Sequence, residues 1–249
     1  MSELQHPDSR SFELVAGLYE RARPEYPGAA IEWLAQKLDL REGRTVVDLG
    51  AGTGKLTRAL LTTGARVIAV EPGDAMRAEL VRGLPGAEAL RGAAEQIPVH
   101  DASVDAVAVG QAFHWFRHDE ALPEIHRVLT ADGALGLIWN ARDRDDPLQQ
   151  EVTRLIEPFV PAGRPGSESW IDPLAGSDLF GRAEEARFPF AQELDEDALV
   201  ARVLSISFVA AATPERRAEL EAQLREVARE VGGSVDFPYV TSVYVSRAV

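Results

Sequence analysis

The feature that most constrains this sequence is an apolar stretch that runs into three alternating glycines. Residues 46–49 read Val-Val-Asp-Leu, then come Gly50, Gly52 and Gly54, and a helical pattern opens near Lys55. Glycine at every second position removes the side chains that would keep a ligand away from the backbone. A helix that begins at this point presents free N–H groups to an anion. The segment therefore predicts a strand, a ligand-binding turn and a helix.

A second apolar stretch, residues 65–70, ends in an acidic residue. This residue is Glu71, which lies 21 positions after Gly50. A carboxylate at the end of the second strand of such a unit can accept hydrogen bonds from both hydroxyls of a ribose. The two features together indicate a ligand that carries a ribose.

The glycine spacing argues against two other nucleotide-binding turns. A dinucleotide fingerprint has its third glycine three residues after the second, and this chain has Lys55 there. A phosphate-binding P-loop would need glycine at position 49 and serine or threonine at position 56, and both positions hold leucine. Dinucleotides and nucleoside triphosphates are therefore disfavoured as ligands.

The pattern Asp-x-Gly-x-Gly-x-Gly at residues 48–54, with an acid at the end of the next strand, resembles motif I of the class I S-adenosylmethionine-dependent methyltransferases. Three further parts of the chain resemble motifs of the same family and follow in its order. They are residues 72–76, residues 92–98 with 103–107, and residues 126–135.

Two flanking segments narrow the resemblance to one branch of that family. Residues 19–27 and the stretch Gln-Ala-Phe-His-Trp-Phe at 111–116 look like signatures of the type-11 small-molecule methyltransferases. The chain departs from many relatives at Ala93, where they carry an aspartate. We therefore expect Ala94 and Glu95 to contact the adenine instead.

The resemblance implies a Rossmann-like α/β fold. Its seven-stranded, mostly parallel sheet has the strand order 3-2-1-4-5-7-6, with a helical cap. It also implies S-adenosyl-L-methionine as cofactor and S-adenosyl-L-homocysteine as product. Asp48 is expected near the amino group of the cofactor, and Arg23 is weighed equally as a contact to its carboxylate and as a surface arginine. The expected cofactor contacts are Tyr19, Arg23, Asp48, Gly50, Ala51, Gly52, Gly54, Glu71, Pro72, Met76, Ala94, Glu95 and Gln111.

The acceptor is expected beyond the cofactor, at the carboxyl ends of the fourth and fifth strands, where open α/β sheets bind ligands. His114 is the candidate base, with a hydrogen-bonded packing residue as the alternative. The aromatic residues beside it can equally belong to the core, as can Met76. The expected pocket residues are Phe113, His114, Trp115, Trp139 and Asn140, with Arg142 on the same edge.

The hydrophobic pattern predicts one domain over residues 1–249. Alternating strands and helices predict a parallel sheet, with strands near 45–49, 66–70, 87–90, 104–110 and 134–139. Thr213 and Pro214 predict the start of a helix with Leu220, Leu224, Val227 and Val231 on one face. The expected parts are an N-terminal helical segment (1–43), a cofactor-binding core (44–141), helical cap elements (142–182 and 192–232) and two last strands (183–191 and 235–249).

Composition limits the function further. Asp and Glu number 40 against 26 Lys and Arg, which gives a formal charge of −14 and argues against a nucleic-acid partner. The chain has no cysteine, no metal-ligand spacing among its histidines and no apolar run of membrane-spanning length. We expect a cytoplasmic monomer or homodimer that methylates a small molecule. A methyltransferase acting on a macromolecule and a non-catalytic S-adenosylmethionine-binding module remain the alternatives.

Overall fold

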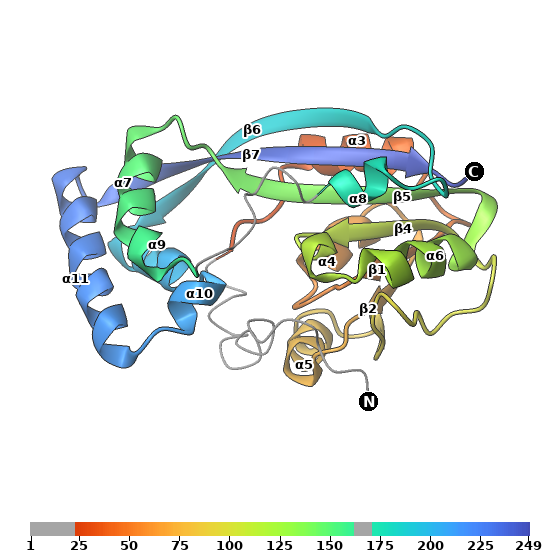
Figure 1. Ribbon diagram of the computed structural model, residues 1–249, viewed down its shortest axis with the longest axis horizontal. Coiled ribbons are helices and arrows are strands. Elements are labelled where there is room, and N and C mark those ends of the chain that lie inside the picture. Colours follow the sequence, from red (N-terminus) through yellow and green to blue (C-terminus); the bar gives the residue numbers. More distant parts are fainter. Residues whose placement is uncertain (1–22, 162–170) are drawn as a thin grey trace.

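The computed structural model describes residues 23–161 and 171–249. Tyr19 lies outside these ranges, as does most of the predicted N-terminal segment before residue 23. Within them, the strands form one seven-stranded sheet with the order β3-β2-β1-β4-β5-β7-β6 (Figure 1). This confirms the predicted strand order. The strands are β1 (Thr45–Leu49), β2 (Arg66–Val70), β3 (Glu88–Leu90), β4 (Val104–Gly110), β5 (Leu129–Arg142), β6 (Glu184–Asp195) and β7 (Ser234–Arg247).

The sheet has a parallel part and an antiparallel part. Strands β3, β2, β1, β4 and β5 pair in parallel with their neighbours. Strand β7 is antiparallel to both β5 and β6. Strand β5 runs on to Arg142, which lies opposite Tyr239, so it is longer than the predicted strand over 134–139. The long antiparallel strands carry the chain beyond the parallel core.

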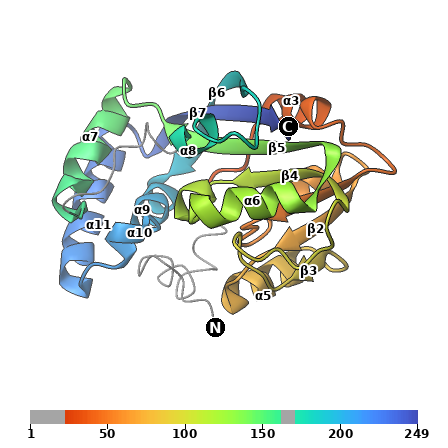
Figure 2. The same ribbon diagram turned by 45° about the vertical axis from the view of Figure 1, so that its right-hand side comes forward.

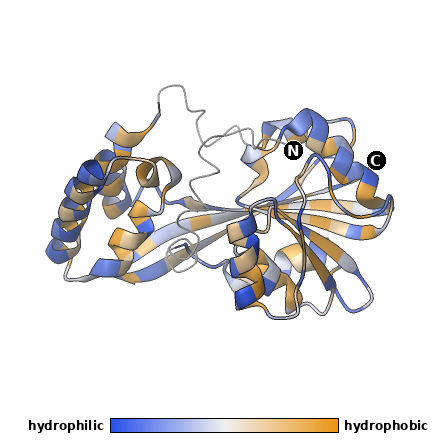
Figure 3. Cartoon of the chain, turned by 90° about the horizontal axis from the view of Figure 1, so that it is seen from below, coloured by the Kyte–Doolittle hydropathy of each residue, from blue (hydrophilic) through white to orange (hydrophobic). Residues whose placement is uncertain are grey.

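Helices cover both faces of the sheet. Successive side chains of β1 point to opposite faces of the sheet. Val46 packs with α3 and α4 on one face, and Val47 packs with α6 on the other. In Figure 3 the strands between the flanking helices are mostly orange, which marks them as apolar. The core helices are α3 (Gly28–Lys37), α4 (Lys55–Leu61), α5 (Asp74–Gly83), the short 3₁₀ helix η2 (Phe113–Trp115), α6 (His118–Val128) and α8 (Asp172–Ala175).

A second group of helices packs on the far ends of β6 and β7 and forms the cap. Its apolar side chains make a cluster of their own with Phe237 and Tyr239 of β7. Figures 1 and 2 both place these helices together at one end of the molecule. They are α7 (Pro147–Ile156) with the 3₁₀ turn η3 (Glu157–Phe159), α9 (Glu196–Leu204), α10 (Ser207–Ala210) and α11 (Pro214–Glu230).

Helix α11 begins where the sequence predicts. The side chain of Thr213 accepts a hydrogen bond from the backbone N–H of Arg216, and Pro214 is the first helical residue. The predicted apolar face is partly wrong. Val231 is 49% exposed, and Ala228 completes the buried face with Leu220 and Leu224, because the helix ends at Glu230.

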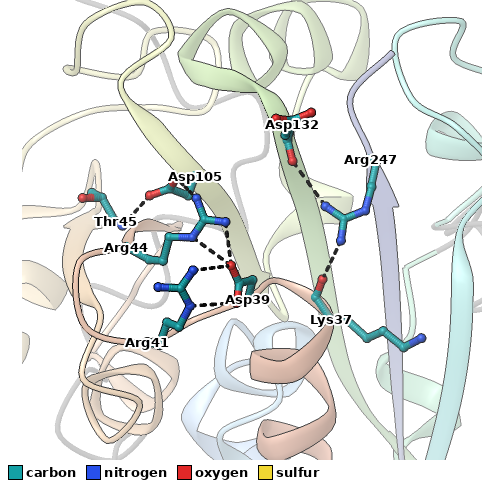
Figure 4. A network of polar contacts seen from close by, with 8 residues as sticks. All are labelled: Lys37, Asp39, Arg41, Arg44, Thr45, Asp105, Asp132 and Arg247. Carbon is teal, nitrogen blue, oxygen red and sulfur yellow. Dashed lines mark hydrogen bonds and ion pairs between the residues drawn. The ribbon is translucent and has the colours of Figure 1, made fainter.

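An ionic network ties the amino ends of the strands together (Figure 4). The guanidinium of Arg44 donates to both Asp39 and Asp105, at 2.6 Å each, and Asp105 also accepts from the backbone N–H of Thr45 at 2.8 Å. Thr45 begins β1, so this network lies at the edge of the sheet opposite the glycine turn. It fixes the loop between α3 and β1 and leaves the carboxyl edge of the sheet open for a site.

Candidate functional site

The glycine turn after β1 uses its three glycines for different purposes. All three have positive φ angles, +72° at Gly50, +57° at Gly52 and +91° at Gly54, a conformation that residues with a Cβ rarely adopt. A Cβ at Gly50 would lie 2.7 Å from that of Ala112, and one at Gly54 would lie 2.8 Å from Leu80. A Cβ at Gly52 would meet no atom within 4 Å. Gly50 and Gly54 therefore permit close packing, and Gly52 faces open space.

Glu71, which follows β2, holds this turn in place. One carboxylate oxygen accepts from the backbone N–H of Gly52 at 2.9 Å, and the other accepts from that of Gly73 at 2.8 Å. The residue is only 9% exposed. Glu71 therefore joins the glycine turn after β1 to the segment that leads into α5.

Asp48 is a buried acid of the site with a strongly raised pKa. Its side chain is completely buried, and one oxygen accepts from the hydroxyl of Thr57 at 2.6 Å. The other oxygen, Oδ1, has no hydrogen-bond partner among the described residues. Burial raises the pKa of Asp48 to about 7, the negative charge of Glu71 adds to this rise, and the Thr57 hydrogen bond opposes it. A buried acceptor without a donor is costly and calls for a ligand group that donates to it.

A cavity opens at this edge of the sheet, between the core and the cap. It encloses about 570 Å³ of space, part of which is continuous with solvent. Residues from the turn, from the ends of β4 and β5, from the segment before α3 and from α9 of the cap form its wall. They are Arg23, Pro24, Tyr26, Asp48, Gly50, Ala51, Gly52, Thr53, Lys55, Leu56, Gly110, Gln111, Asn140 and Arg202.

Gln111 and Asn140 are held together at the carboxyl ends of β4 and β5. Gln111 has a φ of +59°, which is uncommon for a residue with a side chain, and its amide donates to the backbone oxygen of Asn140 at 3.1 Å. The Asn140 side chain accepts from the hydroxyl of Thr241 at 2.7 Å and donates to the backbone oxygen of Glu25 at 3.2 Å. These bonds fix two polar side chains in the wall of the cavity.

His114 lies between two tryptophans. Its ring centroid is 4.4 Å from that of Trp115 and 4.8 Å from that of Trp139, the latter in an edge-to-face arrangement. Among the described residues that line the cavity, His114, Trp115 and Trp139 are absent, so the structure does not bring them together with the wall as predicted. Phe113 is only 1% exposed and packs in the core against Phe116 and His118, so its position favours the core alternative over a pocket wall.

The remaining predicted cofactor residues in the described part of the chain do not line the cavity. Met76 on α5 and Ala94 are buried, and Pro72 lies between Glu71 and α5, partly exposed. The Glu95 carboxylate accepts from the backbone N–H of Arg117 at 2.9 Å, just before α6. The structure therefore brings together Arg23, Asp48, Gly50, Ala51, Gly52, Gln111 and Asn140 from the predicted set.

The sequence reasoning missed Tyr26, Lys55 and Arg202 as wall residues. Tyr26 lies within the predicted signature over 19–27, and its hydroxyl approaches the Cα of Gly110 so closely that a Cβ there would lie 2.5 Å away. Lys55 forms an ion pair with Glu25 at 2.9 Å. Arg202 gave no local signal, because one arginine on an amphipathic helix usually marks a solvated face.

Two classes of feature are missing from the described ranges. Over residues 23–161 and 171–249, no three histidine or acidic side chains are grouped as metal ligands. In the same ranges no helix combines the length and the apolar character that a membrane crossing requires.

Comparison with known proteins identifies the family of this chain. A family model described as "Methyltransferase domain" matches residues 47–137. An uncharacterised methyltransferase of Mycobacterium tuberculosis is 45% identical over 188 residues, which are 69% of this chain and 75% of that protein. An uncharacterised methyltransferase of Schizosaccharomyces pombe is 34% identical over 246 residues, which are 96% of this chain and 98% of that protein.

A solved structure has a similar fold along most of its length. It is a putative type II methyltransferase from Anaeromyxobacter dehalogenans, with a TM-score of 0.65 and 24% identity. The similarity covers 91% of this chain and 97% of that one. Sequence relatives, family model and sheet order agree, and the chain belongs to the class I S-adenosylmethionine-dependent methyltransferases, in the type-11 family.

Proposed function

We propose that this protein transfers a methyl group from S-adenosylmethionine to a small-molecule acceptor in the cavity between the core and the cap. The observation that carries the proposal is the pairing of a buried, unpartnered Asp48 oxygen with the open space above Gly52, both at the wall of one cavity. A donor group of the cofactor would satisfy the first, and the body of the cofactor would fill the second.

The residues present fit this cofactor. Asp48 would accept from the amino group of the methionine part, and Glu71, at the end of β2, would accept from the ribose hydroxyls. When bound, S-adenosylmethionine supplies an electrophilic methyl group on a sulfonium sulfur. The chain then has to align the acceptor, exclude water and, for an acceptor that must lose a proton, accept that proton. Gln111 and Asn140 are the aligning groups, and His114 is the candidate proton acceptor.

The walls of the cavity support a small acceptor. They come from the segment before α3, from the core and from α9 of the cap, so the space is bounded on several sides. A net charge of −14 opposes the approach of a nucleic acid. A macromolecular acceptor would need an open groove, and the wall residues supply a hollow instead.

Calorimetry is the first test. S-adenosylhomocysteine should bind with a Kd in the micromolar range, and NAD and ATP should give no heat, because the glycine spacing fits neither of their turns. Labelled S-adenosylmethionine incubated with a metabolite panel should then transfer label to a small molecule. Tight NAD binding without S-adenosylhomocysteine binding would refute the cofactor assignment. Binding without transfer to any acceptor would favour a cofactor-binding module.

A further inference from the structure

Three arginines from distant parts of the sequence converge at the cap end of the cavity. Arg23 precedes α3, Arg142 ends β5, and Arg202 lies on α9. Arg23 and Arg202 line the cavity. Arg142 lies opposite Tyr239 in the sheet, and the Tyr239 hydroxyl is the hydrogen-bond partner of Arg202. The antiparallel pairing of β5 with β7 therefore places Arg142 beside Arg202.

Arg202 is fixed in position and only partly satisfied. Its Nε donates to the Tyr239 hydroxyl at 2.6 Å, and its guanidinium carbon lies 5.6 Å from the centre of the same ring. The residue is 5% exposed. Its Nη1 is buried and has no hydrogen-bond partner in residues 23–161 and 171–249. The hydrogen bond to Tyr239 holds the Arg202 side chain in place through Nε. It does not supply an acceptor for Nη1.

Arg142 has the same unsatisfied donor. Its Nη1 is also buried without a hydrogen-bond partner among the described residues. Guanidinium N–H groups in proteins commonly donate to carboxylate or phosphate oxygens, often through two parallel hydrogen bonds. Arg142 and Arg202 lie close enough for their charges to interact, so their two buried Nη1 groups can together donate to an oxyanion.

The local charge is positive and uncompensated. In the described part of the chain, no carboxylate lies within ion-pair distance of Arg142 or Arg202. The pKa of Arg142 falls to about 10, chiefly through burial and further through the positive charges of Arg202, Arg144 and Arg23. Burying unpaired cations is costly, and this happens in a chain whose net charge is −14. An anion bound here would remove the cost.

We propose that the methyl acceptor carries a carboxylate or phosphate group, and that Arg142 and Arg202 bind this group at the cap end of the cavity. The proposal rests on the proposed function, since it names the class of acceptor for the same site. Asp48 and the glycine turn lie at the carboxyl end of β1, whereas Arg142 and Arg202 come from β5 and the cap. The methionine carboxylate of the cofactor is the competing occupant, and the test separates the two.

The test is calorimetry on the protein saturated with S-adenosylhomocysteine. Succinate, inorganic phosphate and the neutral succinamide are titrated separately. At least one anion should bind and succinamide should not, and the anion that binds identifies the group as carboxylate or phosphate. Arg142→Gln and Arg202→Gln should each weaken anion binding by at least about tenfold, the scale of a charge-assisted hydrogen bond. Arg154→Gln is the matched control, because Arg154 is exposed and pairs with Glu151.

Two further measurements separate this role from the alternatives. S-adenosylhomocysteine and 5′-methylthioadenosine, which lacks the amino-acid part, are titrated into each variant. Loss of S-adenosylhomocysteine affinity with unchanged methylthioadenosine affinity would assign the arginines to the cofactor carboxylate and overturn the proposal. Tyr239→Phe removes the anchor of Arg202 and keeps the ring, so its thermal midpoint shows how much of the Arg202→Gln effect is structural.

The outcomes for the two proposals differ. If the parent protein binds no S-adenosylhomocysteine, the proposed function fails. If it binds S-adenosylhomocysteine but neither anion, or if both anions bind equally to the parent and the two arginine variants, only the anionic acceptor fails. Preferred transfer of labelled methyl groups to neutral or cationic members of a metabolite panel would overturn it as well.

Discussion

Asp48→Asn tests whether the buried carboxylate of the site is maintained at a cost in stability. The amide mimics the protonated acid in size and charge. In the folded parent the pKa of Asp48 is about 7, against 3.8 for an ordinary aspartate. Between these values the folded state holds a proton that the unfolded state has released. The stability of the parent therefore falls as the pH rises from about 4 to about 7, and it is constant with respect to this group above that range.

The size of the effect follows from the two pKa values. Each pH unit in this window costs about 1.4 kcal/mol, so the parent should lose roughly 3 kcal/mol relative to Asp48→Asn between pH 5 and pH 8. Urea unfolding of both proteins at pH 5, 6, 7 and 8 measures the difference. Asp236→Asn, which removes an exposed carboxylate on β7, is the control for the loss of one negative charge.

The same substitution should weaken binding of S-adenosylhomocysteine. A neutral amide attracts the amino group of the ligand less than a carboxylate does, and hydrogen bonds to charged partners are worth about 1.5 to 3 kcal/mol. Asp48→Asn should thus be more stable than the parent at pH 8 and bind less well, a common trade at functional sites. If the stabilities of the two proteins run parallel from pH 5 to pH 8, the pKa of Asp48 is not raised and the reasoning is wrong.

Substitutions at three other residues test the rest of the site. Glu71→Ala should weaken S-adenosylhomocysteine binding by about 1.5 to 3 kcal/mol, and unchanged calorimetric affinity would place the ligand elsewhere. It should also lower the thermal midpoint, because the backbone N–H groups of Gly52 and Gly73 lose their acceptor. Gly52→Val should abolish detectable binding, since its side chain enters the open space of the cavity, and the strain of a positive φ should cost about 1 to 2 kcal/mol of stability; full binding by a folded variant would contradict this. For His114, a proton-accepting role predicts a kcat lower by roughly 10² in both His114→Gln and His114→Ala, whereas a positioning role between Trp115 and Trp139 predicts more activity in Gln than in Ala; steady-state kinetics over a pH range distinguish the two.

Local patterns determined much of this fold in advance. The glycine turn requires residues that accept positive φ angles, and its place after an apolar strand follows from short-range sequence alone. The start of α11 at Thr213 and Pro214 is similarly local, since a side-chain cap and a proline without an N–H suit the first helical turn. The apolar runs also gave the positions of the parallel strands to within one or two residues, except that β5 extends further at both ends. The position of β7 between β5 and β6 came from the family resemblance, because nothing in an apolar strand specifies its distant partner.

Short-range patterns therefore specify the type of site: a glycine turn, an acid after β2 and a family motif set that together predict a cofactor. Which side chains from distant parts of the chain lie near this turn depends on the fold as a whole. The sequence predicts Arg23 and Arg142 near the site, but it does not link either of them to Arg202, which taken alone resembles a solvated arginine. Arg142 and Arg202 meet because β5 pairs with β7 as far as Arg142 and Tyr239, and α9 packs on β6 and β7. The burial of a charged side chain depends on the segments that cover it, and those segments lie far away in the chain.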